Sequence, residues 1–301
     1  MSERGSHDSP SLEEIIADSS GGELSLMLLL LLLVTALSIL AIGWFARRRR
    51  GAEPSKPTWG FEVILAAFGL WILMQLVGGL LGIAVVGGSR VAIPPEEDPM
   101  VLIASLVGGG LFSLLFAAGL LKLPAWFGGE PDSLAFSGSM VRGLTTGACT
   151  FLLWLPGMIS TTLIWASGLL LLGFDLEGEQ QQVVQLFTSL SEKGSGALLS
   201  LLLLFAVGVA PFVEELLFRG LLFRWLAARF GVGAGILFSS LLFGAVHLEF
   251  SGDGLLFGAL GPVAALGAVS AWLLHRNGNL WACIGLHATF NLAQLSMLLL
   301  N

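Results

Sequence analysis

Charged side chains are scarce in this chain of 301 residues. They make up 12% of it, whereas a soluble globular domain contains roughly 25%. Tyrosine is absent, and the two cysteines, Cys149 and Cys283, lie far apart in apolar segments, without the spacing of a disulfide framework or a cysteine zinc site. The 14 basic residues are outnumbered by 21 acidic ones, so nucleic acid is not an expected partner. With 55% hydrophobic residues and a mean hydropathy of +0.88, the composition indicates an integral membrane protein.

Apolar runs long enough to cross a hydrocarbon core of about 30 Å recur along the chain. They predict an all-α, polytopic membrane helix bundle with about eight transmembrane helices. We expect the spans at residues 24–46, 61–86, 100–121, 143–173, 196–217, 233–248, 255–275 and 280–299.

Charge patterns suggest how these spans are oriented and divided. The first 23 residues form a polar, acidic tail, unlike the basic start of a secretory signal, so the first span is expected to be retained. The positive-inside rule places the arginines at 47–50 in the cytoplasm, which puts both termini on the opposite side. We divide the chain into this tail (1–23), an N-terminal transmembrane region of three spans (24–139) and a C-terminal domain (140–301), and expect a multi-pass protein of a bacterial inner membrane.

Two adjacent glutamates and an arginine interrupt the apolar sequence of the fifth span. Ionised carboxylates in hydrocarbon cost at least about 2.5 kcal/mol each, so Glu214 and Glu215 need partners or a polar pocket. On a helix, Glu215 and Arg219 share a face four residues apart, whereas Glu214 points about 100° away. We expect Arg219 to neutralise Glu215 and to fix the helix, which leaves Glu214 available. The alternative to a functional site is that Glu215 and Arg219 form a buried ion pair with a structural role only.

Two further polar pairs follow within apolar sequence. Phe243 and His247 form one pair, and His287 and Asn291 form the other, each at the i, i+4 spacing of a helix. The chain contains only four histidines, so two of them in hydrophobic stretches, with an unpaired glutamate upstream, indicate one shared polar site. Phe243 is expected to pack beneath this site or to shape a substrate groove.

These residue types can hydrolyse an amide bond. Glu214 and His247 together can hold and deprotonate a water molecule directed at a carbonyl carbon. The side-chain amide of Asn291 and an N–H group of His287 can donate hydrogen bonds to the oxyanion that forms. The sequence therefore predicts an intramembrane endopeptidase with Glu214, His247, His287 and Asn291 as its catalytic residues.

Together these motifs resemble the CAAX-prenyl-protease-like family of intramembrane glutamic endopeptidases, also called the CPBP or Abi family. The resemblance rests on Glu-Glu-x-x-x-Arg at 214–219, Phe-x-x-x-His at 243–247 and His-x-x-x-Asn at 287–291, and covers about residues 140–300. It implies a protease without metal or cofactor, with the four roles just given. The implied partners are membrane-associated or lipidated peptide or protein substrates and the lipid bilayer. The sequence carries no signal for an oligomeric state.

Two other functions are compatible with the same residues. Glu214, His247 and His287 form a His-His-Glu set of the kind that catalytic zinc uses, so a metal-dependent membrane protease is one alternative. A non-catalytic scaffold or transporter, in which buried carboxylates relay protons or gate a partner, is the other.

The expected spans place the three motifs at different depths. At about 1.5 Å per residue, Glu214 and His287 lie near the cytoplasmic side, whereas His247 lies past the midplane. We therefore expect either that the sixth span begins later than residue 233 or that the fifth span is interrupted near Pro211.

Overall fold

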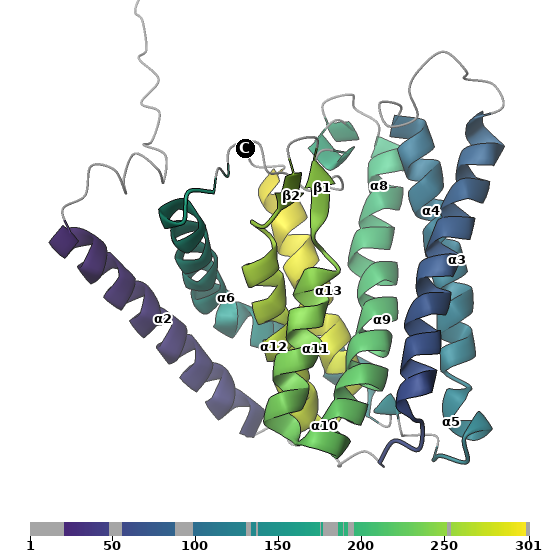
Figure 1. Cartoon of the computed structure of the whole chain (residues 1–301), viewed down its shortest axis with the longest axis horizontal. Helices are drawn as coiled ribbons and strands as arrows, with labels where there is room; N and C mark the ends of the chain where they lie inside the picture. The colour runs from purple at the N-terminus through teal and green to yellow at the C-terminus, as the bar shows by residue number, and fades with distance from the viewer. Residues whose placement is uncertain are drawn as a thin grey trace, which may run out of the picture.

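The computed structural model of the chain describes residues 21–47, 56–87, 99–130, 134–136, 138–174, 176, 186–188, 190–191, 196–251 and 254–298. Its long helices lie side by side as a bundle, which confirms the predicted all-α membrane architecture (Figure 1). Most of the predicted acidic tail lies outside the described residues. A short antiparallel hairpin of β1 (Glu249–Ser251) and β2 (Gly254–Leu256) is the exception to the helical pattern in the described part.

Each of the eight predicted spans corresponds to a helix, although the seventh begins at Leu260 and not at residue 255, which lies in β2. They correspond to α2 (Gly21–Arg47), α3 (Phe61–Gly87), α4 (Pro99–Leu120), α6 (Met140–Leu171), a composite fifth helix over 196–230, α11 (Val232–Ala245), α12 (Leu260–Asn277) and α13 (Leu280–Leu298). Of the described helices, five are long and apolar enough to cross a membrane, namely the first five in this order, and α11 is a shorter apolar helix. A helix satisfies its own backbone hydrogen bonds, which is why apolar sequence of this kind is helical in lipid.

The fifth helix runs without a break from Gly196 to Phe230. It comprises α8 (Gly196–Leu204), the π-helical segment η2 (Phe205–Val209), α9 (Ala210–Glu215), a second π-helical segment η3 (Leu216–Phe223) and α10 (Arg224–Phe230). The predicted end at residue 217 is therefore wrong. The chain turns at Gly231, which has a φ of +90°, a conformation that glycine adopts readily.

The length of the fifth helix explains how the three motifs converge. The two explanations expected from the sequence, a later start of the sixth span or an interruption of the fifth near Pro211, are both wrong. The sixth helix begins at Val232, close to the predicted position, and the fifth continues through Pro211. Almost equal numbers of residues separate Gly231 from Glu214 and from His247, so the two side chains lie at similar depth on consecutive antiparallel helices.

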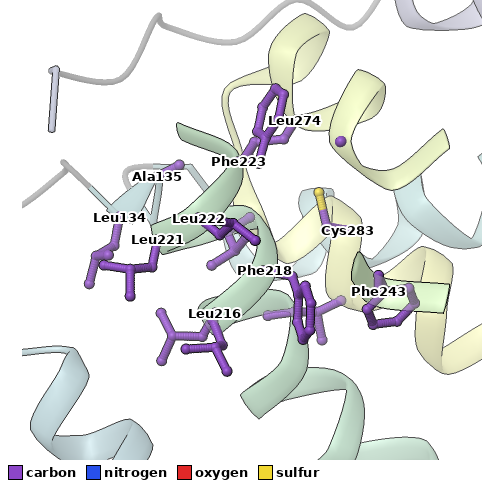
Figure 2. Close-up of a cluster of buried hydrophobic side chains, with 14 of the residues drawn as sticks. Leu134, Ala135, Leu216, Phe218, Leu221, Leu222, Phe223, Phe243, Leu274 and Cys283 are labelled. Carbon is purple, nitrogen blue, oxygen red and sulfur yellow. The ribbon is translucent and has the colours of Figure 1, made fainter. Parts of the chain in front are cut away.

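The fifth helix forms the centre of the hydrophobic core. Its residues 216–223 are all buried, and Figure 2 draws Phe218, Leu221 and Leu222 in one cluster with Leu134, Phe243 and Cys283 from other elements. Phe218 contacts the ring of Phe243 from α11, with 5.0 Å between ring centroids. Because the core encloses η3, the residues just before it are held in a defined orientation.

Small residues allow α3 and α4 to pack closely, at Gly78 and Gly82, which the sequence spaces four residues apart. A Cβ atom at Gly78 would overlap the carbonyl group of Gly108, and one at Gly82 would overlap the carbonyl oxygen of Ala104. Gly110 of α4 similarly faces the ring of Phe205 in the fifth helix. The N-terminal helices are thus packed directly against the C-terminal ones.

Both cysteines are free, as predicted. Their apolar surroundings in the sequence predict that both are buried; this is correct for Cys283 and wrong for Cys149, which is exposed on α6. In a membrane bundle, an apolar segment can face lipid as well as protein.

Candidate active site

Glu215 and Arg219 form the ion pair that the sequence predicts. Arg219 Nη1 lies 3.1 Å from Glu215 Oε1, and both side chains are fully buried. The guanidinium group also lies over the ring of Phe243, 4.1 Å from its centroid. Gly267 of α12 leaves room for it, because a Cβ atom there would come within 3.0 Å of Arg219 Nη2. The pair therefore ties the fifth helix to α11 and α12.

Glu215 accepts hydrogen bonds from two further side chains. The hydroxyl group of Ser270 donates to Oε2 at 2.7 Å, and His287 Nδ1 lies 3.0 Å from Oε1. A carboxylate can only accept, so Nδ1 is the protonated nitrogen of this contact. Ser270 is not among the residues predicted for the site, although a hydroxyl-bearing residue on the otherwise apolar middle turns of the seventh span was an available signal. Glu215 thus fixes the ring of His287.

Glu214 points into a second group of polar contacts. Its Oε2 atom lies 3.6 Å from His247 Nε2 and 3.9 Å from His287 Nε2, so the two predicted histidines and the available glutamate do lie together. The Glu214 side chain is 16% exposed, and that of Glu215 is 0% exposed. The two adjacent carboxylates therefore occupy different environments, as their positions around the helix predict.

The backbone of α11 orients His247. Its Nδ1 atom lies 2.7 Å from the carbonyl oxygen of Phe243, one helical turn earlier. Because a carbonyl group accepts, Nδ1 carries a proton and Nε2 is turned toward Glu214. Phe243 is itself fully buried and packs edge-on against both histidine rings. Of its two predicted roles, the structure shows packing beneath the site.

Asn291 is held by a carbonyl group that the fifth helix leaves unpaired. The Ala210 N–H donates to the carbonyl of Phe205, five residues earlier, as in a π-helix. The next carbonyl, that of Ala206, would need a donor at position 211, where proline has no N–H. Asn291 Nδ2 donates to this oxygen at 2.6 Å. Pro211 thus changes the hydrogen bonding of the helix without breaking it.

The possible metal ligands considered from the sequence are Glu214, His247 and His287. Among the described residues, no group of three or more His, Cys, Asp or Glu side chains is placed so that it could hold a metal ion. The Nε2 atoms of His247 and His287 both face Glu214 Oε2, whereas their Nδ1 atoms contact a backbone carbonyl and the carboxylate of Glu215.

A cavity of about 660 Å³ adjoins the polar group. Its lining includes Glu214, His247, His287 and Asn291, so all four predicted catalytic residues face one space. Most of the remaining lining is apolar and comes from α3, α4, α6, α12, α13 and the fifth helix. A mostly apolar pocket with a few convergent polar groups is the usual form of a substrate site.

This arrangement combines a carboxylate, two imidazole nitrogens and an amide within one partly enclosed space. Of the two adjacent carboxylates, that of Glu215 forms the ion pair with the buried guanidinium group of Arg219. The negative charge of Glu214 is therefore the one directed at the cavity. Such a group can accept a proton from a molecule bound beside it.

Comparison with known proteins finds a family match for part of the chain. Residues 196–293 match the family described as Type II CAAX prenyl endopeptidase Rce1-like. This segment contains all three motifs and is shorter than the region of about 140–300 over which the motifs suggested a resemblance. No curated protein and no solved structure gave a match. Residues 196–293 thus resemble the Rce1-like family of type II CAAX prenyl endopeptidases, which supports a CAAX-type membrane protease, and the long apolar helices before and within this segment make the chain an integral membrane protein.

Proposed function

We propose that the chain is an intramembrane endopeptidase in which Glu214, together with His247, activates water for attack on a peptide bond. The observation that carries the proposal is the group of contacts around Glu214 Oε2. This oxygen faces the Nε2 atoms of both histidines at 3.6 and 3.9 Å, and all three side chains line one apolar cavity.

The spacing suits a shared water molecule. Glu214 Oε2 is buried and has no hydrogen-bond partner among the described residues, so a shared water requires a small rotation of this side chain that brings its carboxylate and His247 Nε2 each within about 2.8 Å of the water molecule. Glu214 then accepts a proton of this water, while His247 Nε2 orients it. Phe243 supports this role through its backbone carbonyl, which holds the His247 ring in place.

In the proposed reaction, the water oxygen forms a bond to the carbonyl carbon and its proton passes to Glu214. The carbonyl oxygen becomes the oxyanion of a tetrahedral intermediate. When the intermediate collapses, the C–N bond breaks and Glu214 returns the proton to the leaving amine. The products are a carboxylic acid and an amine, and the carboxylate of Glu214 is regenerated.

His287 and Asn291 are placed to stabilise the oxyanion. His287 Nε2 faces the same space as Glu214 and can donate a hydrogen bond when it carries a proton. One N–H of the Asn291 amide is donated to Ala206, and the second remains for a substrate oxygen. Preorganised donors of this kind contribute a large share of catalysis in acyl-transfer sites. Glu215, Arg219 and Ser270 hold these groups and do not need to touch substrate.

The test is cleavage of a membrane-peptide library by the detergent-purified chain. We expect wild type to generate new peptide ends, with and without a strong chelator, and Glu214→Gln to generate none. Glu62→Gln, an exposed glutamate in the first turn of α3, is the matched control and should retain wild-type cleavage. Chelator-sensitive cleavage would instead establish a metal-dependent reaction. Equal cleavage by Glu214→Gln and wild type would contradict the proposed role of Glu214.

A further inference from the structure

Two glutamines line the cavity and have no part in the reaction just proposed. Gln294 lies three residues after Asn291 on α13, so the two amide side chains share one face of that helix. Gln75 belongs to the part of the lining that α3 and α4 contribute. This α3–α4 wall comprises Trp71, Gln75, Leu106, Gly110 and Ser113. A polar side chain within an apolar helix costs free energy unless it has a partner, which makes the partner of each glutamine informative.

Neither glutamine has a hydrogen-bond partner among the described residues, and both residues are exposed. Outside the proposed catalytic group, the remaining polar groups of the lining are less available to a ligand. The hydroxyl group of Thr162 donates to the backbone of its own helix, whereas the Ser113 hydroxyl and the indole nitrogen of Trp71 are buried within the wall. The donors and acceptors of Gln75 and Gln294 are therefore open to a molecule in the cavity.

The neighbouring helices hold the two glutamines beside the site. A Cβ atom at Gly109 of α4 would come within 2.9 Å of Gln75 Oε1, so this glycine leaves space for the amide between the two helices. On α13, Asn291 is fixed by a backbone carbonyl of the fifth helix, one turn before Gln294. Both α3 and α13 contact the fifth helix. The two amides thus reach the cavity from different helices, each packed against the helix that carries Glu214.

Cleavage requires a substrate that is locally extended. In a helical segment, each carbonyl and N–H group is bonded within the helix and the side chains surround the backbone. When such a segment opens in an apolar cavity, the peptide groups beside the scissile bond lose these partners, and unpaired peptide groups are costly away from water. In the proposed reaction, Glu214, His247, His287 and Asn291 all act on the scissile peptide group itself. The neighbouring peptide groups therefore need other partners.

We propose that Gln294 and Gln75 bind main-chain peptide groups next to the scissile bond and so hold an apolar substrate segment in an extended conformation. A primary amide both donates and accepts hydrogen bonds, which is the complement of a peptide group. Such contacts do not depend on the substrate side chains, so the cavity takes extended peptides of varied apolar sequence. This inference rests on the proposed endopeptidase function, but its test measures binding, which does not require cleavage.

The probes are a short, fluorescently labelled apolar peptide and a series of analogues in which an ester replaces one backbone amide at a time. An ester has no N–H and is a weaker acceptor, while the side chains are unchanged. Binding is measured by fluorescence anisotropy on the full chain in detergent carrying Glu214→Gln, and mass spectrometry checks that the peptide stays intact. We expect the analogues with an ester at the contacted positions to bind about tenfold less tightly than the parent peptide.

Variants of the glutamines link this preference to the two side chains. Gln294→Leu should weaken binding of the parent peptide about tenfold and leave its sensitive analogue within about threefold of the former affinity, because the contact is already lost. Gln75→Leu should do the same for an ester at another position. Ser296→Leu, also a polar-to-apolar change on α13 but outside the cavity lining, should retain every preference. Gln294→Met serves if the branched side chain impairs folding.

Equal affinity for the peptide and all its analogues, absence of peptide binding, or preferences that persist in both glutamine variants would overturn this inference. Preferences that vanish in Gln294→Leu and Gln75→Leu, combined with a peptide library that the wild type leaves uncut, would instead support main-chain binding and count against the proposed function alone.

Discussion

At the scale of single residues, the two adjacent glutamates have different tasks because they point in different directions from one helix. Glu215 is fully buried and satisfied by Arg219, Ser270 and His287. Glu214 faces the cavity and two imidazole nitrogens. The carboxylate of Glu215 thus orients His287, which is one of the side chains around Glu214. Changes at Glu215 should therefore affect the reaction indirectly.

Removing the hydroxyl group of Ser270 tests this indirect effect. Ser270→Ala leaves Glu215 Oε2 without its donor, and a hydrogen bond to a charged group contributes about 1.5–3 kcal/mol. We expect kcat to fall about 10- to 100-fold with little change in KM, because His287 loses its fixed support but the cavity walls do not change. Ser160→Ala, a buried serine of α6 that donates only to the backbone of Pro156, should leave kcat unchanged. Similar losses in both variants would point to a general packing effect.

Removing the charge of Arg219 should destabilise the fold. Arg219→Met leaves Glu215 as a buried, uncompensated charge, a change that typically costs about 3–5 kcal/mol. We expect a lower free energy of unfolding in a detergent denaturation series, and partial recovery when Glu215→Gln is added, because the second change removes the unpaired charge. A double variant less stable than Arg219→Met would show that the charge is not the cause.

At the scale of elements, the fifth helix has a local change in hydrogen bonding at Pro211, where an interruption was one of two possibilities expected from the sequence. Pro211 withholds a donor from Ala206, and Asn291 from α13 supplies it. The helix remains continuous while gaining a side-chain contact with a distant element. A proline within a membrane helix can therefore hold a polar side chain in place as well as kink the helix.

Replacing this proline should affect activity through Asn291. Pro211→Ala provides an N–H that can bond to the carbonyl of Ala206 and displace the amide of Asn291. We expect a stable protein with a reduced kcat, and little further loss when Asn291→Ala is combined with it, because both changes remove the same positioned donor. The control is Pro156→Ala, inside α6, which should leave kcat at the wild-type level. Multiplicative losses from Pro211→Ala and Asn291→Ala would contradict this link.

At the scale of the whole molecule, α3 and α4 support the site from outside the matched segment. They approach closely through Gly78, Gly82 and Gly108, and they form one wall of the cavity. Separation of this helix pair should therefore change substrate binding as well as stability.

A bulky residue at the contact between these helices should show both effects. Gly82→Leu would collide with the backbone of α4 at Ala104. We expect a lower Tm and a higher KM for any cleaved peptide, since the α3–α4 wall is displaced. Gly69→Leu, on the same helix but facing open space, should change neither. A lower Tm with an unchanged KM would show that the wall does not contribute to binding.

Whether a feature of the fold or the site could be predicted from the sequence depends on how far apart along the chain the contacting residues lie. The pairing of Glu215 with Arg219 follows from helical spacing, and the meeting of Glu214 with the two histidines follows from the scarcity of polar residues in apolar spans. The end of the fifth helix could not be predicted, because Arg219 and Arg224 are buried and so do not mark a membrane boundary.

Contacts that depend on how helices pack against one another could not be predicted from the sequence either. The bond from Ser270 to Glu215 joins residues from different helices whose relative rotation is set by the core. The bond from Asn291 to Ala206 requires a carbonyl group that is free only because η2 is π-helical. Local spacing predicts which face of a helix a residue occupies, but the partner across the interface depends on the whole bundle.

The most direct test of the account is a double-mutant cycle between Glu214 and His247, measured as kcat/KM on a peptide that the wild type cleaves. If the two side chains act on one water molecule, each of Glu214→Gln and His247→Ala should lower kcat/KM about 10²- to 10⁴-fold, the usual range for acid–base catalysis. The kcat/KM of the double variant should then be within about threefold of that of the less active single variant. Losses that multiply, or cleavage that survives Glu214→Gln, would contradict a joint role for these two residues.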